Sequence, residues 1–116
     1  MQFNELKTLA MTALSDMKAE NIVEVDVKGK TSVTDLMVVV SGTSSRHVKS
    51  IAGHLALESK RAGYPPIGVE GEDTGEWVLV DLGDIVVHVM MPEVRDSYAL
   101  EKLWSMSPKD SQTDNA

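Results

Sequence analysis

The chain has 116 residues and no cysteine, and its 18 acidic and 11 basic side chains give a formal net charge of −7. This length suits one domain that buries about two thirds of its unfolded surface without disulfides or structural metals. The lack of cysteine excludes disulfides, thiol nucleophiles and thiolate metal sites. The negative charge disfavours free nucleic acid as the main ligand and would suit a basic protein partner.

The N-terminal segment lacks a basic region followed by a continuous apolar core, and no apolar run approaches the length of a transmembrane helix. We therefore expect a soluble, cytoplasmic protein. Residues 105–116 are mostly polar and contain too few apolar side chains to offset the entropy lost on ordering. This composition predicts a disordered tail over residues 105–116 after a domain over residues 1–104.

The first predicted element is a helix over residues 3–17, where apolar side chains recur at spacings of three and four and so share one face. Glu20-Asn21 is expected to end it. Residues 22–27 alternate valines with acidic residues, which predicts a strand with one buried and one polar face. A polar face on that strand indicates a position near an edge of the sheet.

The middle of the chain contains a second strand and a second helix. Residues 36–40 are continuously apolar, which is typical of a short buried strand. Residues 41–45 are rich in hydroxyl side chains, which cap helix starts, so they predict a helix directly after them. Gly63 and the two prolines that follow are expected to end that helix. A short strand is then predicted over residues 67–70.

Residues 75–90 carry the clearest pattern, because two β-rich runs flank a turn over residues 81–84. Gly83 supplies the positive φ of a tight turn, and aspartates suit the positions beside it. The second run is almost wholly apolar, which favours a strand inside a sheet covered on both faces. Leu82 lies in the turn, where a leucine is difficult to bury, so we expect it to be exposed.

A last helix is predicted after Pro92, and its apolar and aromatic members are Val94, Tyr98, Leu100, Leu103 and Trp104. The full order is helix, strand, strand, helix, three strands and helix. This order predicts a single α/β domain, on the border with α+β, in which helices pack on a mixed sheet of about five strands.

Two acidic residues on one strand face raise an enzymatic alternative. Glu24 and Asp26 have a spacing that can hold Mg²⁺ for nucleotidyl transfer, and the helix start at Ser41-Gly42-Thr43 has free N–H groups that can hold a phosphate. A solvated strand face and ordinary helix capping explain the same residues. A nucleotidyl transferase would also place its carboxylates after the helix start. Catalytic metal binding is therefore the less favoured interpretation.

The histidines offer two further hypotheses. His47, His54 and Glu58 project from nearly the same side of the second predicted helix, as a zinc site would require. Their two-turn spacing favours instead a polar stripe beside the buried face. His88 lies in a buried strand without an identifiable nucleophile or orienting partner, which favours a hydrogen-bonded interior histidine over a general base.

Four segments together closely resemble the ribosomal silencing factor family, RsfS, also called Iojap. They occur in the family's order and spacing, and the resemblance covers about residues 2–104. The segments are Ser41-Gly42-Thr43-Ser44-Ser45-Arg46-His47-Val48, Gly68-Val69-Glu70-Gly71, Trp77-Val78-Leu79-Val80-Asp81-Leu82-Gly83-Asp84 continuing to Val87-His88-Val89, and Tyr98-Ala99-Leu100-Glu101-Lys102-Leu103-Trp104.

The resemblance implies a nucleotidyltransferase-like fold that is not an enzyme, with no cofactor and no metal. Members of the family bind the large ribosomal subunit through its protein number fourteen. By occupying that surface they block joining of the small subunit, and this represses translation under nutrient limitation and in stationary phase. Members also form homodimers, which would compete with ribosome binding.

The resemblance also implies which residues contact the partner. Large rigid side chains such as Trp77 and Tyr98 suit a binding surface, although core packing explains them equally well. Carried over position by position, the implied partner-binding residues are Trp77, Asp81, Leu82, Asp84, His88, Tyr98, Lys102 and Leu103.

Overall fold

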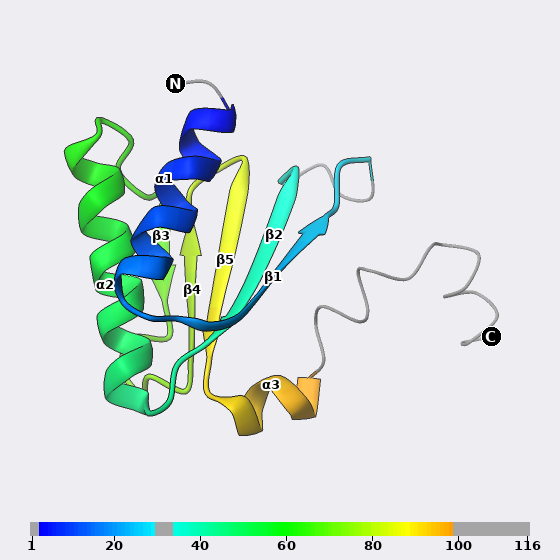
Figure 1. The fold of residues 1–116 in the computed structure, drawn as a ribbon, viewed down its shortest axis with the longest axis vertical. Helices are drawn as coiled ribbons and strands as arrows, with labels where there is room; N and C mark the ends of the chain where they lie inside the picture. The colour runs from blue at the N-terminus through cyan, green and yellow to red at the C-terminus, as the bar shows by residue number, and fades with distance from the viewer. Residues whose placement is uncertain (1–2, 30–33, 99–116) are drawn as a thin grey trace, which may run out of the picture.

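The computed structural model describes residues 3–29 and 34–98 (Figure 1). Its helices are α1 (Phe3–Asp16), α2 (Ser45–Arg61) and α3 (Pro92–Tyr98). Its strands are β1 (Glu20–Asp26), β2 (Leu36–Ser41), β3 (Gly68–Glu70), β4 (Trp77–Asp81) and β5 (Ile85–Met90). This order of helices and strands is the one that the sequence predicts.

The strands form one sheet in the order β1-β2-β5-β4-β3. β2 and β5 run parallel, and the other neighbouring strands are antiparallel. β5 therefore lies in the centre of the sheet, where its six residues are all buried, and β1 lies at an edge. The predicted mixed sheet of about five strands with helices packed on it is confirmed.

Side-chain alternation along the strands divides the core between the two faces of the sheet. α1 and α2 pack together on one face (Figure 1), where Leu14 and Leu55 join the same apolar cluster as Val38, Val80 and Val87. The opposite face carries a smaller cluster near α3, composed of Val25, Val27, Met37, Val39 and Met90 with Trp77 and Val94 at its margin. Val25 of β1 and Val27 directly after it are buried in this cluster and Val23 packs against it, so the predicted valine face is confirmed.

The hairpin between β4 and β5 is confirmed, but its turn is shorter than the predicted residues 81–84. The N–H of Leu82 donates to the carbonyl of Ile85 at 2.9 Å, so these two residues still pair. Only Gly83 and Asp84 remain in the turn. Gly83 adopts a φ of 91°, a left-handed conformation that glycine tolerates without a Cβ clash.

The predicted exposure of Leu82 is wrong. Its side chain is half-buried and packs against the apolar cluster under α1 and α2. Because side chains alternate along a strand, Leu82 falls on the same face as Val80 and Val78, two and four residues earlier. The short turn thus extends the strand pattern by one residue and carries the leucine inward.

The boundary between α1 and β1 also differs from the prediction, because Glu20 and Asn21 begin the strand instead of ending the helix. α1 ends at Asp16, and Lys18 follows with a φ of 58°, a left-handed conformation that stops a helix. Glu20 already pairs with Ser41 of β2. The strand therefore starts immediately after this local reversal.

α2 begins and ends as predicted. The Oγ of Ser44 accepts the N–H of His47 at 3.1 Å, which satisfies one of the free donors of the first turn. Gly63 follows the helix with a φ of 91°. The hydroxyl-rich segment is therefore a helix cap, and the capping interpretation is confirmed.

Arg95 anchors α3 to the end of the sheet. Its side chain is buried, and its Nη1 donates to the carbonyl of Asn21 at 2.6 Å and to the Oγ of Ser41 at 2.9 Å. These bonds connect α3 to the start of β1 and to the end of β2. α3 therefore has a defined position beside the face opposite α1 and α2.

Part of the prediction lies outside the described residues. Lys102, Leu103 and the tail over residues 105–116 are among the residues that are not described, and Tyr98 is placed only as the last residue of α3. Within residues 3–29 and 34–98, no helix is long and apolar enough to cross a membrane.

Candidate partner-binding face

Trp77 and His88 form a hydrogen-bonded pair on the face opposite α1 and α2. The Nε1–H of Trp77 donates to the Nδ1 of His88 at 3.0 Å, and the ring centroids are 5.9 Å apart with planes inclined at 51°. An indole nitrogen only donates, so the Nδ1 of His88 is the acceptor and the neutral ring carries its proton on Nε2. The predicted hydrogen-bonded interior histidine is confirmed.

Burial keeps His88 uncharged at neutral pH. Only 9% of the residue is exposed, and desolvation lowers its pKa from 6.5 to about 4. The unprotonated Nδ1 is therefore available to Trp77 throughout the neutral range. This bond fixes the orientation of the indole ring, which is half-buried and reaches the surface of the face.

The hairpin presents two acidic residues on an ordered backbone, Asp81 at the end of β4 and Asp84 in the turn. The Oδ1 of Asp81 accepts the N–H of Gly83 at 2.8 Å, which braces the turn from within. Asp84 is exposed, and its carbonyl accepts the N–H groups of Asp35 at 3.0 Å and Leu36 at 3.1 Å. The turn is therefore tied to the start of β2, while the carboxylate of Asp84 stays at the surface.

Ile67 is a candidate contact residue that the sequence analysis missed. Its side chain is 74% exposed, and its N–H donates to the carbonyl of Asp81 at 2.8 Å. A Cβ added at Gly83 would lie 3.3 Å from the Cδ1 of Ile67, so this isoleucine flanks the turn. Its sequence signal is an apolar residue directly after two prolines, but single exposed apolar residues are common on protein surfaces.

The structure places Trp77, Asp81 and His88 on one face of the sheet but does not gather them with Asp84 at one point, because Trp77 lies at the start of β4 and Asp84 lies in the turn beyond its end. Trp77 and Asp81 are the first and last residues of β4, about 13 Å apart at ~3.3 Å per residue, and His88 is in register with Leu79 between them on the same face. Asp84 extends this surface at the turn. We call the surface of Trp77, Asp81, Asp84 and His88 the hairpin face. Leu82 is directed to the opposite side of the sheet.

In the enzymatic alternative, the acidic pair of β1 and the start of α2 would form one site, but the strand register places them apart. Asp26 pairs with Leu36, whereas Ser41, which precedes the start of α2, pairs with Glu20 at the other end of β1. The distance from Leu36 to Ser41 along β2 is about 16 Å at ~3.3 Å per residue. Glu24 forms an ion pair with a lysine of α1 at 2.8 Å. The carboxylates and the helix start therefore do not form one site.

The polar residues of α2 have separate partners. The Nδ1 of His47 accepts the N–H of Thr43 at 2.9 Å, so its Nε2–H donates to the carbonyl of Met17 at 2.8 Å. His54 lies 3.4 Å from a carboxylate oxygen of Asp16, and Glu58 pairs with an arginine of the same helix at 3.1 Å. Within the part of the chain that the structure describes, no group of three histidine or acidic side chains is arranged to hold a metal ion. The zinc hypothesis is not supported.

Residues 1–116 match the family model described as "Ribosomal silencing factor during starvation". The chain belongs to the ribosomal silencing factor family. It is 47% identical over 104 residues to the ribosomal silencing factor of Chromobacterium violaceum, covering 90% of this chain and 85% of that one. It is 46% identical over 95 residues to the ribosomal silencing factor of Haemophilus influenzae, covering 82% of this chain and 93% of that one.

The fold is also similar to that of a solved relative. A crystal structure of a Chromobacterium violaceum protein has a TM-score of 0.88 and 46% sequence identity, and the match covers 93% of this chain and 91% of that one. The resemblance read from the four sequence segments is confirmed. The name of the ribosomal silencing factor family describes a ribosome-associated regulator rather than an enzyme.

Proposed function

We propose that this protein binds the large ribosomal subunit through its protein number fourteen and sterically blocks joining of the small subunit. The outcome is repression of translation in the cytoplasm when nutrients are scarce. Membership of the ribosomal silencing factor family supports action on the ribosome. The resemblance of the hairpin and last-helix segments supports the choice of the large subunit and of its protein number fourteen.

The observation that carries the proposed docking site is the contrast between the two faces of the sheet. α1 and α2 cover one face (Figure 1), whereas the hairpin face carries a partly exposed tryptophan at one end of β4 and an ordered acidic turn at the other. An aromatic side chain held in one orientation loses little entropy on binding and so makes an effective anchor. Trp77 is held in this way by its bond to His88.

Charge is the second support for the docking site. The chain carries a formal net charge of −7, and Asp84 presents an exposed carboxylate at the tip of the hairpin. Surface proteins of a ribosome that lie on RNA are expected to be basic, because they neutralise phosphates. Acidic groups at the turn would steer such a partner to the hairpin face, and its aromatic residue lies at the other end of β4. Ile67 adds apolar contact area beside the turn.

Cosedimentation with purified subunits tests the proposal. The protein should pellet with large subunits at low salt and should not pellet with small subunits. Adding it before mixing the two subunits should reduce the light scattering of the joined ribosome. If it fails to pellet with large subunits at low salt, the proposed function is wrong.

A pair of charge reversals tests the docking site. Asp84→Lys should weaken binding by at least about tenfold, because it places a cation where a basic partner approaches. Asp16→Lys changes the net charge equally at an exposed position on α1, and it should bind like the wild type. If both variants bind equally well, the hairpin turn is not part of the interface.

The resemblance also implies a homodimer, and we propose that the dimer uses the same hairpin face. Self-association and ribosome binding would then exclude each other. Light scattering across protein concentrations should show a dimer that Asp84→Lys alters and Asp16→Lys leaves unchanged. A dimer that pellets intact with large subunits would contradict this arrangement.

A further inference from the structure

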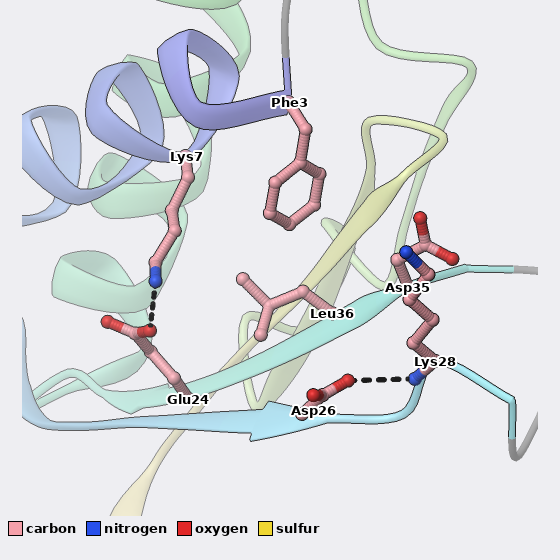
Figure 2. A pocket seen from close by; sticks show the side chains of 7 residues that line it. All are labelled: Phe3, Lys7, Glu24, Asp26, Lys28, Asp35 and Leu36. Atoms are coloured by element: carbon pink, nitrogen blue, oxygen red, sulfur yellow. Dashed lines mark hydrogen bonds and ion pairs between the residues drawn. The ribbon is translucent and has the colours of Figure 1, made fainter.

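A pocket lies on the other side of the sheet from the hairpin face, at the end where α1 begins. Its volume is about 400 Å³, within the range of pockets that hold small molecules. Phe3 at the start of α1 and Leu36 at the start of β2 give it an apolar lining (Figure 2). Figure 2 shows the ring of Phe3 extending from the helix toward Leu36. An aromatic face and a branched aliphatic side chain suit an apolar ligand body.

The polar part of the lining has an acidic excess. Three carboxylates, those of Glu24, Asp26 and Asp35, share the pocket with the ammonium groups of Lys7 and Lys28, which leaves one net negative charge. The pair between Lys7 and Glu24 at 2.8 Å already neutralises one group of each sign. The remaining charges therefore favour a ligand that is itself cationic.

The remaining carboxylates have capacity to accept hydrogen bonds. The Oδ1 of Asp26 accepts only a backbone N–H, that of Lys28, at 3.0 Å, among its partners in the described residues. The carboxylate of Asp35 is half-buried, and it has no ion pair or hydrogen bond to any residue in the described ranges. A half-buried acceptor beside an apolar floor is favourable for a charged donor.

We propose that this pocket binds a small organic ammonium compound with an apolar body. The ammonium group would donate to Asp26 and Asp35, and the apolar body would lie between Phe3 and Leu36. The ring of Phe3 adds an attractive face for a cation. Simple amines and zwitterionic amino acids share this chemistry, and Lys28 would favour the zwitterion by pairing with its carboxylate.

The pocket is connected to the hairpin turn by backbone hydrogen bonds. The N–H groups of Asp35 and Leu36 both donate to the carbonyl of Asp84. A ligand that holds Asp35 therefore also affects Asp84, the turn residue that we assign to partner binding. This consequence rests on the proposed function: occupancy of the pocket should change the affinity for the large subunit, whereas ligand binding itself does not depend on the ribosome.

Backbone amide NMR of the ¹⁵N-labelled full chain tests the site with three compounds of similar shape. Phenethylamine should shift the amide signals of Asp26, Asp35 and Leu36 in a saturable manner, and 3-phenylpropionate should not. Phenylalanine distinguishes the two ligand classes. If it binds, the pocket accepts zwitterionic amino acids; if it does not bind while phenethylamine does, the pocket accepts simple amines. The proposal is overturned if phenethylamine causes no saturable shifts there, or if the anion binds equally well.

Matched variants locate the charge that binds the ammonium group. Asp35→Asn should weaken phenethylamine binding by about tenfold, since a bond to a charged partner is lost. Asp73→Asn removes an equal charge from an exposed loop before β4 and should leave the binding unchanged. The amide spectrum of each variant reports whether it is folded. If both variants are folded and bind phenethylamine with equal affinity, Asp35 does not bind the ammonium group.

The same compounds separate failure of this inference from failure of the proposed function. Saturable binding in NMR without any effect on cosedimentation sustains the pocket and contradicts its connection to the hairpin turn. Normal cosedimentation without saturable binding sustains the proposed function and overturns the pocket.

Discussion

The two faces of the sheet differ in what covers them and in what they contain. Under α1 and α2 the strands bury aliphatic side chains, and the polar residue buried on α2, Ser59, donates its hydroxyl to a carbonyl of its own helix at 3.1 Å. The opposite face combines valines and methionines with His88, and its α3 end includes the buried Arg95. Each of these polar side chains has a specific partner. The first face therefore accounts mainly for stability, and the second combines stability with a surface suited to a partner.

The largest expected loss of stability comes from a substitution on the helix-covered face of the sheet. Leu55→Ala should lower the free energy of unfolding by about 2–5 kcal/mol, because it opens a cavity under α2 where the leucine is fully buried. Urea denaturation at neutral pH measures this change. Leu57→Ala on the same helix removes a side chain that is 45% exposed and should change stability by less than about 0.5 kcal/mol. Equal effects of the two changes would contradict the packing described for α2.

The next effect is a pH dependence that comes from the opposite face. The pKa of His88 is lower in the folded protein than in the unfolded chain, so above pH 6.5 the residue is neutral in both states. Between pH 6.5 and about 4 the unfolded chain takes up a proton that the folded protein does not. As the pH is lowered through this window, the free energy of unfolding should therefore decrease by up to about 3 kcal/mol because of His88.

Urea denaturation at pH 7, 5.5 and 4.5 measures this dependence. His88→Gln keeps a side chain that can accept a hydrogen bond but does not titrate, so its stability should fall less over the same range. Carboxylates contribute equally to both proteins, and their contribution cancels in the comparison. If the free energy of unfolding changes with pH equally in the wild type and the variant, His88 is not the group responsible.

A smaller effect is expected when the bond between the rings is removed. Trp77→Phe keeps an aromatic side chain but leaves the Nδ1 of His88 without its donor, which should cost about 1–2 kcal/mol of stability. Because the ring is then less firmly oriented, binding to large subunits should also weaken. If the variant is as stable as the wild type, the hydrogen bond contributes less than its geometry implies.

The smallest effect on stability should come from the flank of the hairpin turn. Ile67→Ser alters a side chain that is 74% exposed, so the free energy of unfolding should change by less than about 0.5 kcal/mol. Binding to large subunits should nevertheless fall, by about fivefold or more, if the isoleucine is buried against the partner. Unchanged binding by the folded variant would remove Ile67 from the proposed interface.

The sequence predicted the elements of this fold well because their signals are local. The apolar run of β5, the hydroxyl cap before α2 and the glycine of the hairpin turn each have one favoured structure. Leu82 was misplaced because its burial depends on turn length, which decides whether the strand alternation continues through residue 82. A change of one residue in the turn reverses which side of the sheet receives that leucine.

The candidate site was only partly predictable. The resemblance supplied Trp77, Asp81, Asp84 and His88, but the bond between the tryptophan and the histidine depends on strand pairing that links residues eleven positions apart. The exposure of Ile67 likewise depends on how the segment after α2 approaches the hairpin turn. Interactions between distant segments are set by packing, so periodicity and spacing carry little information about them.

Site-directed photocrosslinking tests the central claim most directly, because it reports whether the hairpin turn or the outer surface of α2 touches the ribosome. A photoreactive phenylalanine analogue would replace Ile67 beside the hairpin turn in one variant and Leu57 on α2 in the other, since both side chains are exposed. With purified large subunits, the variant at residue 67 should crosslink to protein number fourteen, and the variant at residue 57 should not. Crosslinking to that protein from residue 57 alone would contradict the assignment of the hairpin face.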